Sequence, residues 1–195
     1  MTKDKWQDFY FHKAKKEGFF ARSVYKLEEA DSKFNLVKKG ARVLDLGCAP
    51  GSWLQYLSKK VGKEGAVVGI DLLSPKFSAE NTKTFVVDVL TIDMQEIEKL
   101  GSFDLVTSDL APATTGISVT DAARSLRLAR RALEIACSVL KAGGKLFVKI
   151  FEGPETKQLR EEMKGHFEEV KAFKPRASRS ESREFYLVGL GFKSK

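Results

Sequence analysis

The feature of this 195-residue chain that most constrains its fold is a glycine-containing turn at residues 47–51. The apolar run 41–46 precedes the turn and predicts a short buried strand. Gly47 and Gly51 permit backbone conformations closed to other residues, and Ser52 is the expected cap of a helix that runs to Val61. A strand, a tight turn and a helix predict a ligand-binding corner, because ligands of open α/β sheets bind at the carboxyl ends of the strands.

Acidic residues stand in or at the ends of three predicted strands. Asp45 lies in the first, Asp71 ends the strand 66–71, and Asp88 ends the strand 83–88. The turn lacks the G-x-G-x-x-G spacing of a dinucleotide-binding site, so it favours a nucleoside without phosphates. In such a site the Asp45 carboxylate is suited to bind an amino group of the ligand, the Asp71 carboxylate to bind its ribose hydroxyls, and the Asp88 carboxylate to bind the amine of an adenine. The alternative is that these are ordinary strand-end carboxylates, with Asp88 capping a helix.

The remaining pattern alternates strands with helices and predicts one α/β domain over residues 1–195. Further strands are expected at 103–109, 145–151, 167–173 and 185–190, and helices at 5–16, 19–34, 93–100, 121–140 and 155–166. Gly143 and Gly144 are expected to close the helix 121–140. We therefore predict a mostly parallel seven-stranded sheet with an antiparallel last strand and helices on both faces.

The charge of the chain indicates a polyanionic partner. It carries 34 Lys and Arg against 26 Asp and Glu, a net charge of +8, and a basic protein of this kind commonly binds nucleic acid. Residues 1–40 hold ten basic and six acidic residues, and residues 171–183 hold five basic residues and one acidic residue. We expect these two segments to lie together over the sheet. The arginines of the helix 121–140 are interpreted as a solvated face; they are Arg124, Arg127, Arg130 and Arg131.

Hydropathy and cysteine content indicate which classes of protein this chain does not resemble. No apolar run approaches the roughly 18 residues of a membrane span, and the lysine-rich start has no apolar signal core, so we expect a cytoplasmic protein. Cys48 and Cys137 are interpreted as packing residues rather than a metal or redox pair. The absence of a long unexplained apolar surface stretch favours a monomer.

Two lysines stand out by their positions. Lys149 lies between Val148 and Ile150 in a strand expected to be covered on both faces, where an ammonium group requires a partner or neutrality. The alternative is an edge lysine with its charge in solvent. Lys26, in the helix 19–34, is by itself expected to be a surface residue.

Four motifs follow one another along the chain. They are Asp-Leu-Gly-x-Ala-Pro-Gly-x-Trp at 45–53, Ser-Asp-Leu-Ala-Pro at 108–112, Phe-Val-Lys-Ile-Phe at 147–151 and Ser-Arg-x-x-Ser-Arg-Glu-x-Tyr at 178–186. In this order they closely resemble the FtsJ/RrmJ family of ribose 2′-O-methyltransferases, over nearly the whole chain. The resemblance implies a Rossmann-like sheet and S-adenosylmethionine as methyl donor.

The resemblance also implies roles for individual residues. A catalytic Lys-Asp-Lys-Glu tetrad falls on Lys26, Asp109, Lys149 and Glu184. The expected contacts to the methionine end and sulfonium of the donor are Gly47, Ala49, Pro50, Gly51 and Trp53. Asp71 is expected to contact the donor's ribose and Asp88 its adenine, and Asp109 is expected to close the site.

Methyl transfer to a ribose hydroxyl requires alignment of the reacting atoms and removal of a proton, and it requires no metal. We hypothesise that Lys149 orients and deprotonates the 2′-hydroxyl, that Asp109 tunes Lys149, and that Lys26 with Glu184 fixes the ribose. Desolvation and a second ammonium group lower the pKa of a lysine, which suits it to this task.

Within the family, this compact chain most resembles the bacterial-type enzyme that methylates a uridine in the A-loop of large-subunit (23S) ribosomal RNA, either as RNA or in the assembled large subunit. Residues 1–40 are expected to form a basic helical extension that contributes to RNA binding with the loop 174–183, and Phe19, Phe20 or Tyr186 to contact bases. A tRNA ribose 2′-O-methyltransferase of the same family and a non-catalytic RNA-binding module are the alternatives.

Two other enzyme classes fit the residues less well. A nicotinamide-dependent oxidoreductase would need the missing glycine fingerprint. A base-amine methyltransferase would need an aromatic residue in the turn 108–112.

Overall fold

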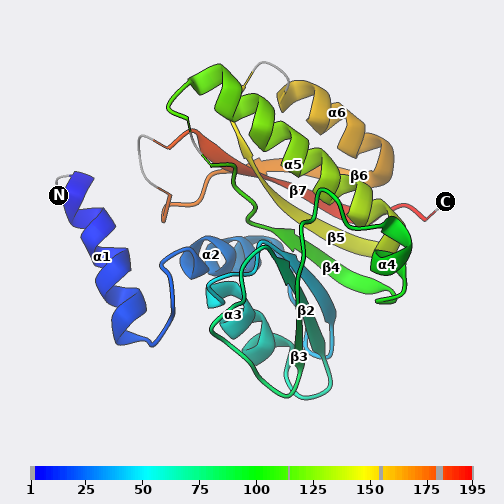
Figure 1. Cartoon of the computed structure of the whole chain (residues 1–195), viewed down its shortest axis with the longest axis horizontal. Coiled ribbons are helices and arrows are strands. Elements are labelled where there is room, and N and C mark those ends of the chain that lie inside the picture. The colour runs from blue at the N-terminus through cyan, green and yellow to red at the C-terminus, as the bar shows by residue number, and fades with distance from the viewer. Residues whose placement is uncertain (1–2, 114, 154–155, 179–181, 195) are drawn as a thin grey trace.

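The computed structural model describes residues 3–113, 115–153, 156–178 and 182–194, with side chains from residue 9 onward. Within these residues seven strands form one sheet in the order β3-β2-β1-β4-β5-β7-β6 (Figure 1). The strands are β1 (Arg42–Leu46), β2 (Ala66–Asp71), β3 (Thr82–Val86), β4 (Phe103–Ser108), β5 (Leu140–Phe151), β6 (Phe167–Phe173) and β7 (Glu184–Phe192). The helices are α1 (Lys3–Lys16), α2 (Val24–Phe34), α3 (Ser52–Val61), α4 (Met94–Glu98), α5 (Ser118–Val139) and α6 (Thr156–His166).

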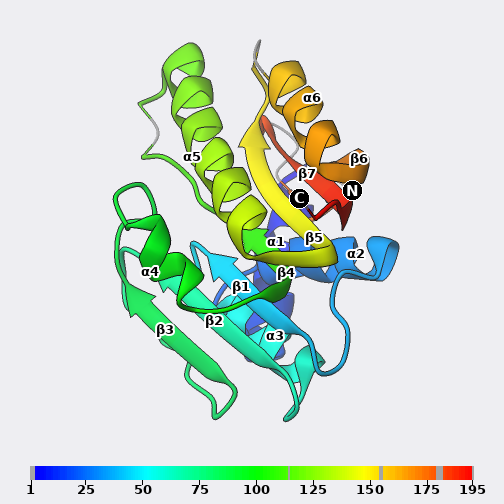
Figure 2. The same ribbon diagram turned by 90° about the vertical axis from the view of Figure 1, so that its right-hand side faces the viewer.

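Helices cover both faces of the sheet (Figure 1 and Figure 2). One buried cluster joins residues of α4, α5 and α6 to the sheet, and includes Leu126 and Ile135. A second joins residues of α2 and α3 to the sheet, and includes Leu27 and Leu57. This arrangement confirms the predicted α/β layers, and it explains why Leu44 of the interior strand β1 is fully buried.

The sheet is parallel from β3 through β5, and β7 is antiparallel to both of its neighbours, β5 and β6. The predicted antiparallel last strand is therefore confirmed. In the β5–β7 register Lys149 stands opposite Tyr186, and Phe151 stands opposite Glu184. Residues that are 30 or more positions apart in sequence thus meet at the carboxyl end of β5.

The strand order reverses at β1, because the chain continues to β2 on one side and β4 lies on the other. The carboxyl ends of β1 and β4 are neighbours at this switch point, where ligands of open α/β sheets bind. Gly47 follows β1 and Asp109 follows β4. The topology therefore brings the glycine turn and the second motif to one place.

Two helix starts differ from the predictions. The helix expected from residue 19 begins at Val24, because tertiary contacts hold the preceding segment: the Phe20 N–H donates to Gln55 Oε1, and Gln55 Nε2 donates to the Gly18 carbonyl. Ser52 is the first residue of α3 and makes no capping hydrogen bond; Gly51 is the cap residue, and the Ser52 hydroxyl lies 3.1 Å from that of Ser23.

The end of α5 also differs from the prediction. The helix ends at Val139, and Gly143 and Gly144 do not close it, because both lie within the long strand β5. Gly143 has φ +75°. The pair instead belongs to an irregular first half of that strand, before its register with β4 becomes regular at Lys145. The helix also starts three residues before the predicted Asp121.

The two basic segments lie together, as predicted. The backbone N–H of Arg176 donates to Glu29 Oε2 of α2 at 2.8 Å, and the rings of Phe34 and Phe173 lie 5.4 Å apart. Helix α1 stands off from the sheet (Figure 1) and contacts α2 through the rings of Tyr10 and Tyr25, 5.3 Å apart. Residues 179–181 of the predicted basic loop lie outside the described residues. Among the described helices, none has the length and apolar content needed to span a membrane.

Candidate active site

The turns that follow β1 and β4 pack directly on each other. Gly47 has φ +82°, and a Cβ atom at this position would lie 3.0 Å from the Leu110 backbone nitrogen. The Asp109 N–H donates to the Leu46 carbonyl at 3.0 Å, which joins the second turn to the first. Only glycine combines this backbone conformation with so close an approach, so the predicted need for glycine at this turn is confirmed.

A cavity of about 500 Å³ opens beside these two turns. Its volume lies in the range of small-molecule and cofactor sites, about 300–1,000 Å³. Five of the predicted donor-binding residues line it: Gly47, Ala49, Asp71, Asp88 and Asp109. The other lining residues are Leu72, Val89, Leu90, Leu110, Ala111, Pro112, Ala113, Arg124, Arg127 and Leu128.

Two carboxylates hold the cavity wall in place. Asp71 accepts hydrogen bonds from the N–H groups of Ala49 at 2.8 Å and Leu73 at 2.9 Å, and so ties the turn after β1 to the turn after β2. Asp88 lies two residues beyond β3 and accepts from the Leu90 N–H at 2.8 Å. The helix-capping alternative for Asp88 is wrong, because Asp93 caps α4.

Asp45 lies beneath the turn and is fully buried. Its Oδ1 accepts a hydrogen bond from Thr107 Oγ1 at 2.8 Å, whereas its Oδ2 has no hydrogen-bond partner among the described residues. Burial raises the pKa of this carboxyl to about 7. Asp45 is not among the residues that line the cavity.

Three other predicted donor contacts also lie outside the cavity lining. Trp53 is 3% exposed, and its indole N–H donates to the Ser23 carbonyl at 2.9 Å. Gly51 has φ +117°, and a Cβ atom there would lie 2.9 Å from the Phe77 Cβ. Pro50 is exposed, and its carbonyl accepts from the Lys76 N–H. These residues shape and support the turn rather than forming the cavity wall.

Arginines of α5 contribute to the site in a way that the sequence analysis missed. Arg124 and Arg127 line the cavity. Arg131 donates to the carbonyls of Val89 at 2.8 Å and Ile92 at 2.5 Å, and thereby fixes the loop after β3. The interpretation of these arginines as a solvated face is therefore wrong for Arg131, and Arg130 is paired with Glu162. Helical spacing alone cannot reveal which loop an arginine will reach.

Lys149 and Asp109 form a buried ion pair at the cavity. Lys149 is 6% exposed; its Nζ donates to the Asp109 carbonyl at 2.6 Å and lies 3.1 Å from Asp109 Oδ1. Burial acts to raise the pKa of Asp109, but the charges of Lys149 and Lys26 outweigh burial and hold that pKa below its ordinary value. Lys149 is thus a buried, paired lysine, and the edge-lysine alternative is wrong.

Lys26 and Glu184 form a second ion pair next to the first. The Lys26 ammonium contacts Glu184 Oε1, and both side chains are nearly buried. The surface position expected for Lys26 on its own is therefore wrong. The four residues of the predicted tetrad come from α2, β5, β7 and the turn after β4, and they form two ion pairs coupled through Asp109.

Tyr186, which is fully buried, contacts this cluster through Asp109. Its hydroxyl donates to Asp109 Oδ1 at 2.7 Å, and its ring stacks on that of Phe147 with 4.4 Å between centroids. Phe147 in turn stacks on Trp53 at 5.7 Å. Because Tyr186 has no exposed surface, the expectation that it contacts RNA bases is wrong. Phe20, at 45% exposure, remains accessible.

The arrangement suits proton handling and positioning rather than covalent catalysis. A carboxylate that is ionised at neutral pH and two lysines converge beside a cavity partly lined by apolar side chains. Cys48 lies within the turn 47–51, but it is 2% exposed and burial raises its pKa, so it is inert and packs as predicted.

Comparison with known proteins agrees with this geometry. A family model described as FtsJ-like methyltransferase matches residues 19–192. The chain belongs to the FtsJ-like methyltransferase family. The match covers all four motifs, so the resemblance drawn from them is confirmed, and the chain is a methyltransferase with the expected Rossmann-like fold.

Relatives within this methyltransferase family match over nearly their whole length. The chain is 46% identical over 191 residues to "Ribosomal RNA large subunit methyltransferase E" of Bdellovibrio bacteriovorus, covering 96% of this chain and 97% of the relative. It is 47% identical to the protein of the same name in Myxococcus xanthus, covering 94% and 88%.

A solved structure extends the comparison. A protein assigned as a ribosomal RNA methyltransferase from Plasmodium falciparum superimposes with a TM-score of 0.80 at 26% identity, covering 91% of this chain and all of that one. The structural comparison supports the Rossmann-like fold, and the family match, which ends at residue 192, includes β7.

Proposed function

We propose that this methyltransferase transfers a methyl group from S-adenosylmethionine to the 2′-hydroxyl of a ribose in large-subunit ribosomal RNA. The observation that carries the proposal is the Lys149–Asp109 ion pair, whose Asp109 lines a cofactor-sized cavity. Lys26 of the second pair, Lys26–Glu184, also lowers the pKa of Asp109 through its charge. The names of the relatives support ribosomal RNA as the substrate.

The residues around the cavity fit the proposed donor. S-adenosylmethionine, when bound, supplies the methyl group from a positively charged sulfur. Gly47 leaves room for a ligand against the backbone, and the carboxylates of Asp71, Asp88 and Asp109 present acceptors and negative charge to a cationic, hydroxyl-rich molecule. We propose that these residues and Ala49 contact the donor, while Asp45, Pro50, Gly51 and Trp53 hold the turn in shape.

The tetrad has separate tasks in this proposal. Lys149 positions the ribose 2′-hydroxyl and, as the neutral amine left after it has released a proton to solvent, accepts the hydroxyl proton. A positioned general base of this kind contributes about 10²–10⁴-fold to rate. Asp109 holds Lys149 through two contacts and is itself held by the Tyr186 hydroxyl. Lys26 and Glu184 fix the ribose, and each keeps a small exposed part of its side chain, 10% and 13%, that a ribose can reach.

The RNA is proposed to reach the site over the basic segments. Residues 1–40 are proposed to act as a basic helical extension of the single domain. Within it, Glu29 of α2, three residues after Lys26, accepts a hydrogen bond from the Arg176 N–H of the second basic segment. We propose a uridine of the A-loop as the modified nucleotide, a monomeric protein and a cytoplasmic location, in keeping with a ribosomal RNA substrate.

To test the proposal, the protein is incubated with methyl-labelled S-adenosylmethionine and, in parallel reactions, with unmodified large subunits, free large-subunit RNA or tRNA. Any labelled ribose is then mapped. Label at one ribose of the large-subunit RNA is the expected result. Label on tRNA alone would assign the chain to the alternative tRNA function, and donor binding without any label would contradict the roles proposed for the tetrad.

A further inference from the structure

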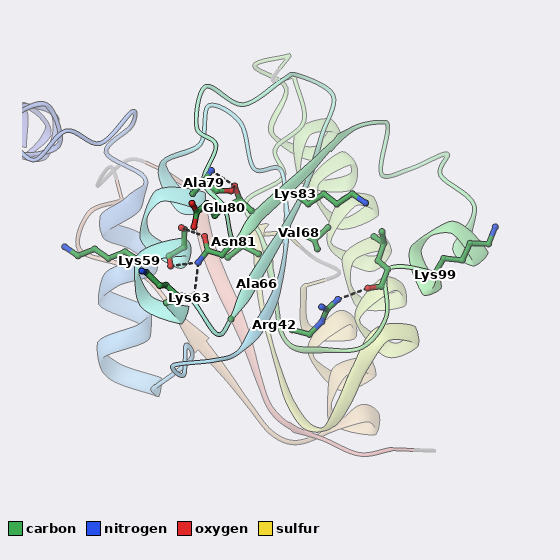
Figure 3. Close-up of a pocket in the computed structure, with 16 residues that line it drawn as sticks. Arg42, Lys59, Lys63, Ala66, Val68, Ala79, Glu80, Asn81, Lys83 and Lys99 are labelled. Atoms are coloured by element: carbon green, nitrogen blue, oxygen red, sulfur yellow. Dashed lines mark hydrogen bonds between the residues drawn. The ribbon is translucent and has the colours of Figure 1, made fainter.

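The edge of the sheet opposite the candidate active site carries a second cleft, of about 830 Å³, at the amino ends of β1, β2 and β3 (Figure 3). It is bordered by the end of α3, the turn before β3 and the end of α4. Among its described lining residues Glu80 is the one acid, and the cations are Arg42, Lys59, Lys63, Lys83 and Lys99. None of these residues belongs to the proposed methyl-transfer machinery.

Three of these lysines have no acidic partner. Within the described residues no carboxylate lies within 4.0 Å of Lys59, Lys63 or Lys83, and all three side chains are exposed. Other lysines of the chain do form such pairs, for example Lys60 with Asp31. An unpaired positive cluster on one cleft raises the local concentration of anions and is best neutralised by an anionic partner.

The positive charge continues past Arg42 along the same edge. A neighbouring cavity of about 450 Å³ has Asp104 as its one described acidic lining residue, and its cations are Lys38, Lys39, Lys141 and Lys145. Burial, and then the charge of Lys38, lowers the pKa of Lys145. Together the linings of the two cavities hold nine cations and two acids, against 34 cations and 26 acids in the whole chain. Lys99 is paired with Glu96 and Lys141 with Asp104, and the charged groups of the other seven cations have no carboxylate within 4.0 Å among the described residues. The far edge is therefore much more basic than the protein as a whole.

The spacing of the ammonium groups fits an extended anionic ligand better than a small anion. Figure 3 shows Lys59, Lys63, Lys83 and Lys99 spread along the cleft, with their ammonium groups pointing apart rather than toward one point. The frame is fixed: Asn81 bridges the carbonyls of Ser58 and Gly62 at 3.0 and 2.9 Å. Charges held apart on a rigid frame match successive phosphates of a nucleic-acid backbone.

We propose that this basic far edge binds the phosphate backbone of a second segment of large-subunit RNA, away from the ribose that is methylated. The inference rests on the proposed function, because it takes the same RNA as partner. The five residues of β1 separate the two edges by roughly 17 Å at about 3.3 Å per residue, so phosphates bound at the cleft are not those of the nucleotide held in the active site. The protein therefore recognises a large folded RNA at two places.

The test compares two triple variants that lose the same charge. The first, Lys59→Gln with Lys63→Gln and Lys83→Gln, changes the cleft. The control, Lys157→Gln with Lys164→Gln and Lys193→Gln, changes exposed lysines of α6 and of the segment after β7, at the β6 end of the sheet and outside the basic segments 1–40 and 171–183. Binding of transcribed large-subunit RNA is measured at 50 and 200 mM KCl, and donor binding and methyl transfer to a short target hairpin are measured in parallel.

Each phosphate contact contributes about 0.7–0.9 to the slope of log affinity against log salt. Loss of three contacts should flatten the slope by about 2–3, so that wild-type affinity falls about 20- to 40-fold more than that of the cleft variant over this fourfold change in salt. The control should keep the wild-type slope, and both variants should bind the donor and methylate the hairpin normally.

Equal slopes for the two variants, with methyl transfer to ribosomal RNA intact, would overturn this inference and leave the proposed function standing. A wild-type protein that binds the donor but transfers no methyl group to ribosomal RNA would overturn the proposed function, and the inference with it.

Discussion

The buried carboxyl of Asp45 makes the stability of this methyltransferase depend on pH in an unusual direction. Its side chain has no exposed surface and one of its oxygens has no hydrogen-bond partner among the described residues. Its pKa in the folded protein is about 7, against an ordinary value of 3.8. The folded state therefore binds a proton that the unfolded state has already lost, and the folded protein should lose stability as pH rises from about 4 to above 7.

The size of the effect follows from the two pKa values. Each unit of difference corresponds to about 1.4 kcal/mol, and between pH 5 and pH 8 linkage gives a loss of about 2.5 kcal/mol in the free energy of unfolding. Asp45→Asn removes the titration and keeps an oxygen to accept from Thr107. Its amide N–H groups lack a partner, which costs about 1–3 kcal/mol at every pH and so does not alter the slope.

Urea unfolding of both proteins from pH 5 to pH 8 measures the difference. We expect wild type to lose about 2.5 kcal/mol relative to Asp45→Asn over this range. Asp104→Asn is the control. Partial burial acts to raise the pKa of Asp104, but the hydrogen bonds and charges of Lys141 and Arg42 together outweigh burial and lower that pKa, so Asp104 titrates mainly below pH 5. A wild-type minus Asp45→Asn difference that stays constant with pH would refute the reasoning.

Three further substitutions test the site. Lys149→Met should lower the rate of methyl transfer by about 10²–10⁴-fold with donor binding retained by calorimetry, and turnover near wild type would exclude Lys149 as the base. Gly47→Ala, at φ +82° and 3.0 Å from the Leu110 nitrogen, should cost about 1–3 kcal/mol of stability and weaken donor binding; unchanged values of both would contradict the close packing of the two turns. Phe147→Ala removes the fully buried ring between Trp53 and Tyr186 and should destabilise the protein by about 3–5 kcal/mol in urea unfolding, whereas a loss below 1 kcal/mol would mean that the stack contributes little.

The elements that the sequence predicts well are those with a local cause. The buried strands are continuous apolar runs, and Gly47 needs a backbone conformation that other residues avoid, so both leave a mark in a short window of sequence. Lys149 was also identifiable, because an ammonium between apolar neighbours requires a partner. The partner itself, Asp109, came from the family resemblance.

The features that sequence analysis missed depend on contacts between distant segments. Ser52 faces Ser23 rather than capping its own helix, and Arg131 reaches the loop after β3 across 42 residues. Tyr186 has the composition of an RNA-contacting aromatic residue, but β7 directs it under Asp109. Such positions are decided by tertiary packing, and a single sequence carries no local signal for them.

The position of β7 has a consequence for the order in which the molecule forms. It is the last strand along the chain, yet it lies between β5 and β6 inside the sheet. During synthesis β6 therefore emerges before the strand that it pairs with, whereas β1 to β4 and all residues that line the proposed donor cavity, none later than Leu128, have already been made. Glu184 arrives with β7, so a nascent chain contains every residue of the proposed donor cavity well before it contains the full proposed tetrad.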